Sequence, residues 1–281
     1  MKGLEAILSR LSVQAPTSNR SLLEIEQRKV ELYNAEEGDL HETDGYTCPI
    51  CKNKGHIGLL SEYPAGCWTM DYRECKCMDV RRSIKRMKKS GLKNIIKDYT
   101  FDKFIAEESW QKAIKDAAVE YAKNPEGWFF LGGQSGAGKT HLCTAICREL
   151  LLSGKRVRYM LWRDDVVKLK GAVTESDEYT KLIDEYKNTE VLYIDDLFKT
   201  GKAADNTIQK PTGADVNVAF EIINYRYNNP ALLTIISSEL SQDELIDIDE
   251  AIGGRIYEKA TAFSIGKNRE RNYRIRKVGV L

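Results

Sequence analysis

One segment near the middle of the chain combines closely spaced glycines with a lysine and a hydroxyl side chain. It consists of Gly133, Gln134, Ser135, Gly136, Ala137, Gly138, Lys139, Thr140 and His141. The first eight residues fit the pattern G-x-x-x-x-G-K-[ST], which curls backbone N–H groups around phosphate oxygens at the start of a helix. Lys139 would bring a full charge to the outer phosphates, and Thr140 would offer a hydroxyl to Mg²⁺. The segment predicts an ATP site; the alternative is a glycine-rich turn with a chance lysine.

Two acidic residues further along the chain could complete such a site. Residues 191–194 form an apolar run, and Asp195 and Asp196 follow it directly. A buried strand here would place both carboxylates at its carboxyl end. We expect Asp195 to reach Mg²⁺ through a water molecule and Asp196 to polarise the attacking water. The alternative is an acidic helix cap after a strand.

Five of the seven cysteines cluster within residues 48–77. The candidate zinc ligands, a C-x-x-C pair and a C-x-C pair, are Cys48, Cys51, Cys75 and Cys77. Two such pairs can close a tetrahedral thiolate site on Zn²⁺, and a small module needs a metal because it builds little core. Cys67 and His56 are substitute ligands. Scattered reduced cysteines are the alternative, and a redox pair lacks the expected strand–helix context.

The elements that would position these residues alternate between strand and helix. Predicted strands are Trp128–Leu131, Val157–Trp162, Val191–Ile194, Leu232–Ser238 and Thr261–Ile265, and predicted helices are Ser109–Lys123, Lys139–Leu152, segments within 163–188, and 214–228. This order predicts an α/β fold with a mostly parallel sheet flanked by helices. Cys143 and Cys147 would lie on one face of the second helix, where we expect core cysteines rather than metal ligands.

The composition suits a soluble protein with no membrane partner. The chain has 281 residues, 30% of them charged, and a net charge of +1. No apolar run reaches the ~20 residues that a membrane helix needs. The first residues, MKGLEAILSRLS, interrupt their apolar stretch with charges and do not resemble a signal peptide. We therefore expect a cytoplasmic protein.

Four segments in order resemble the helicase-loader branch of the AAA+ ATPases, which includes the DnaC and DnaI loaders, their phage counterparts and the IstB transposition ATPases. The segments are GQSGAGKTH, VLYIDDL, TIISSEL and AIGGRI, and the resemblance covers about residues 98–281. It implies an AAA+ fold, self-association through the AAA+ domain, ATP with Mg²⁺, single-stranded DNA and a replicative hexameric helicase as partners. Arg255 matches the arginine finger that acts on a neighbouring subunit's ATP, with Lys259 as an alternative finger.

One position departs from the family pattern. The family often ends a strand with the polar sensor T-S-N, whereas this chain has Ser237, Ser238 and Glu239. An ionised Glu239 cannot donate a hydrogen bond to a γ-phosphate. Either Ser238 performs this role or ATP turnover is slow.

Basic residues suggest two surfaces for nucleic acid. The first comprises Arg163, Lys168, Lys170, Tyr179 and Lys181, in the region where the family often places DNA-binding residues. Such side chains would combine phosphate contacts with base stacking. The second is the uninterrupted basic run at 81–97. For both surfaces, an ordinary solvated helix face is the alternative.

The chain therefore divides into four predicted parts. These are an N-terminal helical segment at 1–45, a zinc-binding module at 46–80, a basic linker helix at 81–100 and an AAA+ ATPase domain at 101–281. Within the first part, Leu4, Ile7, Leu8 and Leu11 share a helical face, and Ser21 with Glu24 forms a capping-box pattern. The predicted function is an ATP-dependent loader of a replicative helicase. The alternatives are an IstB-like transposition regulator and a non-catalytic ATP-binding nucleic-acid adaptor.

Overall fold

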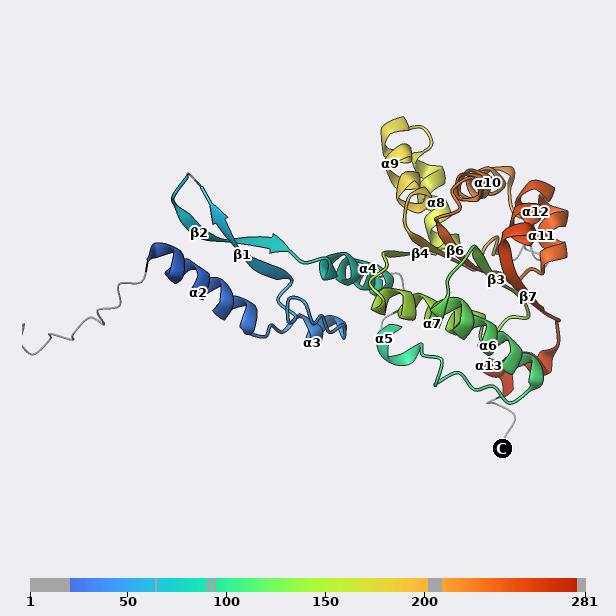
Figure 1. Cartoon of the computed structure of the whole chain (residues 1–281). Coiled ribbons are helices and arrows are strands. Elements are labelled where there is room, and N and C mark those ends of the chain that lie inside the picture. Colours follow the sequence, from blue (N-terminus) through green and yellow to red (C-terminus); the bar gives the residue numbers. More distant parts are fainter. Residues whose placement is uncertain (1–20, 64, 90–91, 93–94, 202–208, 277–281) are drawn as a thin grey trace, which may run out of the picture. The chain divides into compact units, whose positions relative to one another are not determined.

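The structure is a computed structural model that describes residues 21–63, 65–89, 92, 95–201 and 209–276 (Figure 1). It divides into two compact units, one within residues 1–41 and 47–75 and the other within 42–46 and 76–281. The apolar stripe predicted between Leu4 and Leu11 lies outside the described residues.

The first unit consists of one helix packed on a hairpin. Helix α2 (Leu22–Ala35) begins at Ser21, whose capping box with Glu24 is formed as predicted. The helix contacts both strands of an antiparallel pair, β1 (His56–Glu62) and β2 (Trp68–Glu74), which the sequence analysis did not predict. The Asn34 side chain fixes this packing, because it hydrogen-bonds both the N–H and the carbonyl of Gly58 at 2.9 Å. A short helix, α3 (Leu40–Asp44), follows α2 in the chain.

The second unit contains a five-stranded parallel sheet in the order β4-β5-β6-β3-β7. The strands are β3 (Trp128–Gly133), β4 (Val157–Leu161), β5 (Val191–Asp195), β6 (Leu233–Ser237) and β7 (Ala260–Ile265). All four strand pairs are parallel, which confirms the predicted α/β class. The carboxyl ends of the strands therefore meet at one edge of the sheet, which is where the predicted phosphate-binding and acidic residues lie.

Helices cover both faces of this sheet, so its strands are apolar on both sides. Along β3, Trp128 and Phe130 belong to a core shared with α8 (Trp162–Ala172), α9 (Ser176–Lys187), α10 (Gly213–Tyr227), α11 (Gln242–Ile248) and α12 (Glu250–Lys259). Phe129 alternates with them and packs on Tyr121, at 5.3 Å between ring centroids. Tyr121 belongs to α6 (Ser109–Lys123), which packs against α7 (Lys139–Leu152). Figure 1 shows α6 and α7 on one side of the sheet and α8 to α10 on the other.

The basic run supplies a helix that also has a buried face. Helix α4 (Cys77–Lys89) packs against β4 and α7, and α5 (Ile95–Asp98) follows it. Val80, Ile84 and Met87 are fully buried, and Arg81 forms a 2.5 Å ion pair with Asp44. The spacing of these apolar residues explains why a strongly basic segment is helical here. A role of its exposed side chains in DNA binding stays a prediction.

The structure differs from the sequence prediction at one element boundary and in the segment after β7. Trp162 begins α8 instead of ending β4, because the Asp165 carboxylate accepts the Leu161 N–H at 3.1 Å and starts the helix there. After β7 the chain forms a 3₁₀ turn (Arg269–Arg271) and the short helix α13 (Tyr273–Arg276), neither of which was predicted. Among the described residues, no helix is both long and apolar enough to span a membrane.

Candidate functional site

The glycine-rich loop lies between the end of β3 and the start of α7. Gly133 and Gly136 have φ angles of +95° and +74°, and Gly138, the N-cap of α7, has +90°. A Cβ atom on Gly133 would lie 2.0 Å from the Ile265 carbonyl oxygen. Positive φ and close backbone approach both require glycine. The loop therefore has the local geometry of an anion cradle at a helix N-terminus.

Two polar side chains, one within the loop motif and one directly after it, hold neighbouring segments in place. The Gln134 side-chain oxygen accepts the Asn268 N–H at 2.9 Å. The His141 ring bonds the Thr100 carbonyl at 2.8 Å and packs edge-on against Phe104. Gln134 thus ties the loop to the segment after β7, and His141 ties the start of α7 to the segment before α6.

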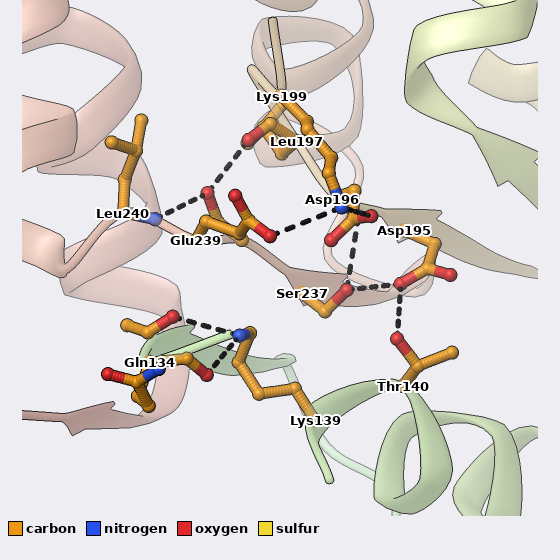
Figure 2. A network of polar contacts seen from close by, with 12 residues as sticks. Gln134, Lys139, Thr140, Asp195, Asp196, Leu197, Lys199, Ser237, Glu239 and Leu240 are labelled. Carbon is orange, nitrogen blue, oxygen red and sulfur yellow. Dashed lines mark hydrogen bonds and ion pairs between the residues drawn. The ribbon is translucent and has the colours of Figure 1, made fainter. Parts of the chain in front are cut away.

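The Lys139 side chain is buried inside the loop. Its Nζ donates to the carbonyl oxygens of Gly133 and Gln134, both at 2.8 Å (Figure 2). Burial lowers the pKa of Lys139, whereas the charges of Asp196 and Glu239 act in the opposite direction. The ammonium is therefore held where phosphate oxygens would approach the loop.

Asp195 accepts hydrogen bonds from hydroxyls on three strands and one helix. Thr140 donates to its Oδ1 at 3.2 Å and Tyr193 to the same atom at 2.7 Å. Tyr159 donates to Oδ2 at 2.8 Å, and Ser237 donates to Oδ1. The carboxylate is almost fully buried. A hydroxyl beside a carboxylate is an oxygen-only ligand pair, which suits Mg²⁺.

Asp196 lies one residue later in a strained turn. Its φ is +58°, in the left-handed region that non-glycine residues rarely adopt. The turn is held by the Asp196 N–H, which donates to Ser237 Oγ at 3.1 Å, and by Lys199 Nζ, which donates to Asp196 Oδ2 at 2.7 Å. Burial is the main cause that raises the pKa of Asp196, and the nearby charge of Asp195 adds to it.

The polar residues at the end of β6 have separate surroundings. Ser238 is fully buried; its hydroxyl donates to the Leu197 carbonyl at 2.7 Å and accepts the Leu240 N–H at 3.1 Å. Glu239 instead forms an ion pair with Lys199 at 3.2 Å. Of the two candidates for the polar sensor, Ser238 has a hydroxyl that is already bonded to the backbone, whereas the Glu239 carboxylate contacts Lys199.

Arg255 is not brought to the loop of its own chain. Its guanidinium lies 5.2 Å from the ring centroid of Phe220 and 5.3 Å from that of Tyr227, and it donates to the Ala251 carbonyl at 2.8 Å. Lys259 lies over the same Tyr227 ring at 5.0 Å. A role of Arg255 as a finger that acts on another subunit stays a prediction.

The first of the predicted DNA surfaces is partly engaged in contacts within the chain. Lys168 pairs with Asp165 at 2.7 Å, Lys170 pairs with Asp215 at 2.6 Å, and the Tyr179 hydroxyl donates to Glu221 at 2.6 Å. Arg163 and Lys181 are exposed. Lys168 is exposed as well, despite its ion pair. A role of these three side chains in DNA binding stays a prediction.

The four predicted zinc ligands lie together. The sulfur atoms of Cys48, Cys51, Cys75 and Cys77 all lie within 4.8 Å of one another, and those of Cys48 and Cys75 are 3.9 Å apart. Tetrahedral Zn–S bonds of about 2.3 Å imply sulfur separations of about 3.8 Å. All four residues are buried, so the donor set fits Zn²⁺.

The remaining predicted candidates fall outside this cluster. Cys67 is exposed, and neither it nor His56 belongs to a metal-binding group among the described residues. Cys143 and Cys147 are fully buried in α7, as predicted, and burial raises the pKa of both thiols.

Sequence reasoning did not identify several residues at the site. Tyr159 and Tyr193 both donate to Asp195. They lie opposite each other in β4 and β5, and this pairing depends on the register of the two strands, which cannot be read from the sequence. Lys199 could have been identified from the sequence, because it lies three residues after Asp196 and a lysine at this spacing can pair with the carboxylate. Asn272 contacts the loop, since a Cβ on Gly136 would lie 2.0 Å from its Oδ1. No local pattern indicates this contact, because it depends on the path of the chain after β7.

Comparisons with known proteins place the chain among replication ATPases. The family model of the bacterial DnaA ATPase domain matches residues 95–256, more than half of the chain. The chain is 32% identical to the phage-like element PBSX protein XkdC of Bacillus subtilis, over 82% of this chain and 86% of that protein. It is 30% identical to the replicative helicase loader DnaC of Escherichia coli, over 44% of this chain and 51% of DnaC. A crystal structure of the DnaC helicase loader shares the fold, with a TM-score of 0.51 and 24% identity over 61% of this chain and 99% of that one.

Proposed function

Because this chain belongs to the family of the bacterial DnaA ATPase domain and is a DnaC/DnaI-type AAA+ ATPase, we propose that it loads a replicative hexameric helicase onto single-stranded DNA in an ATP-dependent cycle. The observation that carries the ATPase part is the convergence of Lys139, Thr140, Asp195 and Asp196 at the carboxyl edge of one parallel sheet. The loader part rests on the similarity to DnaC.

We infer a task for each of these side chains, which the geometry supports. The backbone N–H groups at the start of α7, together with Lys139, bind and orient the phosphates. Thr140 and Asp195 would hold Mg²⁺, which when bound neutralises charge on the outer phosphates. Asp196, at the end of the same strand, accepts a hydrogen bond from the attacking water and takes its proton. Its burial supports this role, because a raised pKa makes the carboxylate a stronger base.

The first unit supports a function that needs a second protein. Its Cys48, Cys51 and Cys75 belong to the cluster that fits Zn²⁺, and a bound metal would stabilise the hairpin on which α2 packs as a docking module. Leu22, Ile25 and Leu32 of α2 are exposed, as expected of a helix that packs on a partner. We propose that this unit holds the helicase, while the ATPase domain self-associates and contacts single-stranded DNA in the cytoplasm.

The two alternatives are less well supported. A non-catalytic adaptor does not need the water-polarising acid that Asp196 supplies, and the chain has an ATPase domain. An IstB-like transposition regulator does not account for the cysteine module, since the IstB resemblance concerns the ATPase part.

A helicase-loading assay tests the proposal. Purified bacterial replicative helicases would be incubated with circular single-stranded DNA, with and without this chain and ATP, and the helicase retained on the DNA would be measured after gel filtration. We expect at least one helicase to be retained more strongly with chain and ATP, and Lys139→Ala to remove the gain.

Two results would contradict the proposal in different ways. Undiminished loading by Lys139→Ala would separate loading from the nucleotide site. ATP hydrolysis without any effect on a panel of hexameric helicases, combined with stimulation of a transposase on duplex DNA, would favour the IstB-like alternative.

A further inference from the structure

Lys199 connects the two carboxylates that end neighbouring strands. Its Nζ lies 2.7 Å from Asp196 Oδ2, at the end of β5, and 3.2 Å from Glu239 Oε1, just after β6 (Figure 2). Burial lowers the pKa of Lys199, but the hydrogen bond to Asp196 and the two negative charges outweigh this and leave it raised. The group is therefore a stable cation between the water-polarising acid and the sensor position.

The backbone is shaped to aim this lysine at the site. Asp196 and Phe198 have positive φ angles of +58° and +60°. The Lys199 N–H returns to the Asp196 carbonyl at 2.9 Å, which closes a tight turn. Two strained non-glycine residues in three positions persist only where the surrounding structure holds them, and such strain is concentrated at functional sites.

The same lysine faces the phosphate loop across a cavity. The cavity has a volume of about 850 Å³, and its lining includes Lys199, Glu239 and the loop residues Gly133, Gln134 and Ser135. The Lys199 side chain is 33% exposed, so its ammonium is accessible from this space. The Lys139 ammonium bonds two loop carbonyls, whereas among the described residues the Lys199 ammonium pairs only with the carboxylates of Asp196 and Glu239.

The position of the charges gives Lys199 a task that Mg²⁺ and Lys139 would not perform. Mg²⁺ would lie at Thr140 and Asp195, and Lys139 bonds the loop carbonyls, whereas Lys199 is the cation that pairs with both Asp196 and Glu239. Ser238 has its hydroxyl bonded to the Leu197 carbonyl, and Glu239 has no proton to donate. The neutral donor that the family often places at this position is thus missing among the residues at the end of β6.

We propose that Lys199 is the γ-phosphate-sensing residue of this chain, held in place by Glu239. A terminal phosphate oxygen draws the ammonium away from Asp196, which leaves that carboxylate able to accept the proton of the attacking water. Lys199 stays protonated throughout and transfers no proton. The inference rests on the proposed ATP-driven function and names the residue that distinguishes ATP from ADP at the same site.

Nucleotide affinity tests this role without relying on turnover. The dissociation constants for ADP and for a non-hydrolysable ATP analogue would be measured by calorimetry, with Mg²⁺, for the whole chain and for Lys199→Met, Lys199→Arg and Lys267→Met. Lys267 is a matched control, because it lines the same cavity and pairs with Glu244 rather than with the sensor position.

The expected pattern is specific to the γ-phosphate. Lys199→Met should reduce the preference for the triphosphate over ADP about tenfold or more, while its ADP affinity stays within about twofold, equivalent to less than about 0.5 kcal/mol. Lys199→Arg should keep most of the preference, and Lys267→Met should keep all of it.

Three results would overturn the inference. A full triphosphate preference in Lys199→Met would show that the lysine does not read the γ-phosphate. An equal loss of ADP and triphosphate affinity would show a structural role only. If the unaltered chain bound neither nucleotide, the proposed function itself would fail, which is distinguishable because the control variant would fail too.

Discussion

Replacing Arg226 should destabilise the ATPase domain more than any exposed substitution. This arginine of α10 is completely buried, and its guanidinium makes five hydrogen bonds. The acceptors are the carbonyls of Tyr186, Lys187, Thr189 and Leu233 and the Thr234 hydroxyl. Burial lowers the pKa of Arg226 to about 9, so the group remains charged at neutral pH. One side chain therefore joins the end of α9 to β6.

The size of the effect follows from these contacts. A hydrogen bond to a charged group contributes about 1.5–3 kcal/mol, and a simple sum over five bonds would overshoot because burying the cation costs several kcal/mol. Arg226→Met removes the charge but leaves four carbonyls without this donor, two of them in buried contacts and two in part-buried ones. We expect a loss of about 3–5 kcal/mol in the free energy of unfolding, because each buried acceptor left without a donor costs about 1–3 kcal/mol.

Urea unfolding followed by tryptophan fluorescence would measure this loss. Arg226→Lys should recover part of it, since an ammonium keeps the charge with three donors instead of five. Arg163→Met, an exposed position on α8, should change stability by less than about 0.5 kcal/mol. A cost below about 1 kcal/mol for Arg226→Met would refute the reasoning, because the orphaned carbonyls would then have found other donors.

Two further predictions concern the metal cluster and the subunit contact. Metal analysis of reduced, chelator-free protein should find about one Zn²⁺ per chain. Cys48→Ser should lower this zinc content, whereas the exposed control Cys67→Ser should leave it unchanged. Absence of zinc from the unaltered chain would contradict the tetrathiolate assignment. The Arg255→Ala variant should bind ATP but hydrolyse it poorly. Mixing it with Lys139→Ala should restore part of the ATPase activity, because each variant supplies the group that the other lacks. A mixture no more active than its components would exclude a role of Arg255 in trans.

The sequence predicted the parts of the site that depend on short patterns. The loop from Gly133 to Thr140, the acids after an apolar run and the paired cysteines each need only local spacing, so their positions could be found without a structure. The parallel sheet followed from the alternation of strands and helices. Trp162 was assigned to the wrong element because an apolar residue at a boundary fits a strand end as well as a buried helix start.

The rest depended on contacts between distant segments. The β1–β2 hairpin has weak alternation, and its register is visible only once α2 packs on it. In the sequence, Arg226 cannot be distinguished from the other charged residues of its helix, because its hydrogen-bond acceptors lie at the end of α9 and in β6. The Glu239 departure was visible in the sequence, but its partner Lys199 required the knowledge that β5 and β6 are neighbours in the sheet.

The two acids at the end of β5, Asp195 and Asp196, are adjacent in the chain but are held in place by different contacts. Asp195 is buried and held by hydroxyls from α7, β4, β5 and β6, so its position depends on the register of these three strands. Asp196 lies in a strained turn, and its carboxylate is held by the partly exposed Lys199. A metal ligand must keep its position through the cycle, whereas an acid that polarises water must change its hydrogen-bond partner. We infer that the variable contact lies at Asp196, the residue whose proposed role requires a change of partner, and that Lys199 is the side chain through which a bound γ-phosphate would control that change.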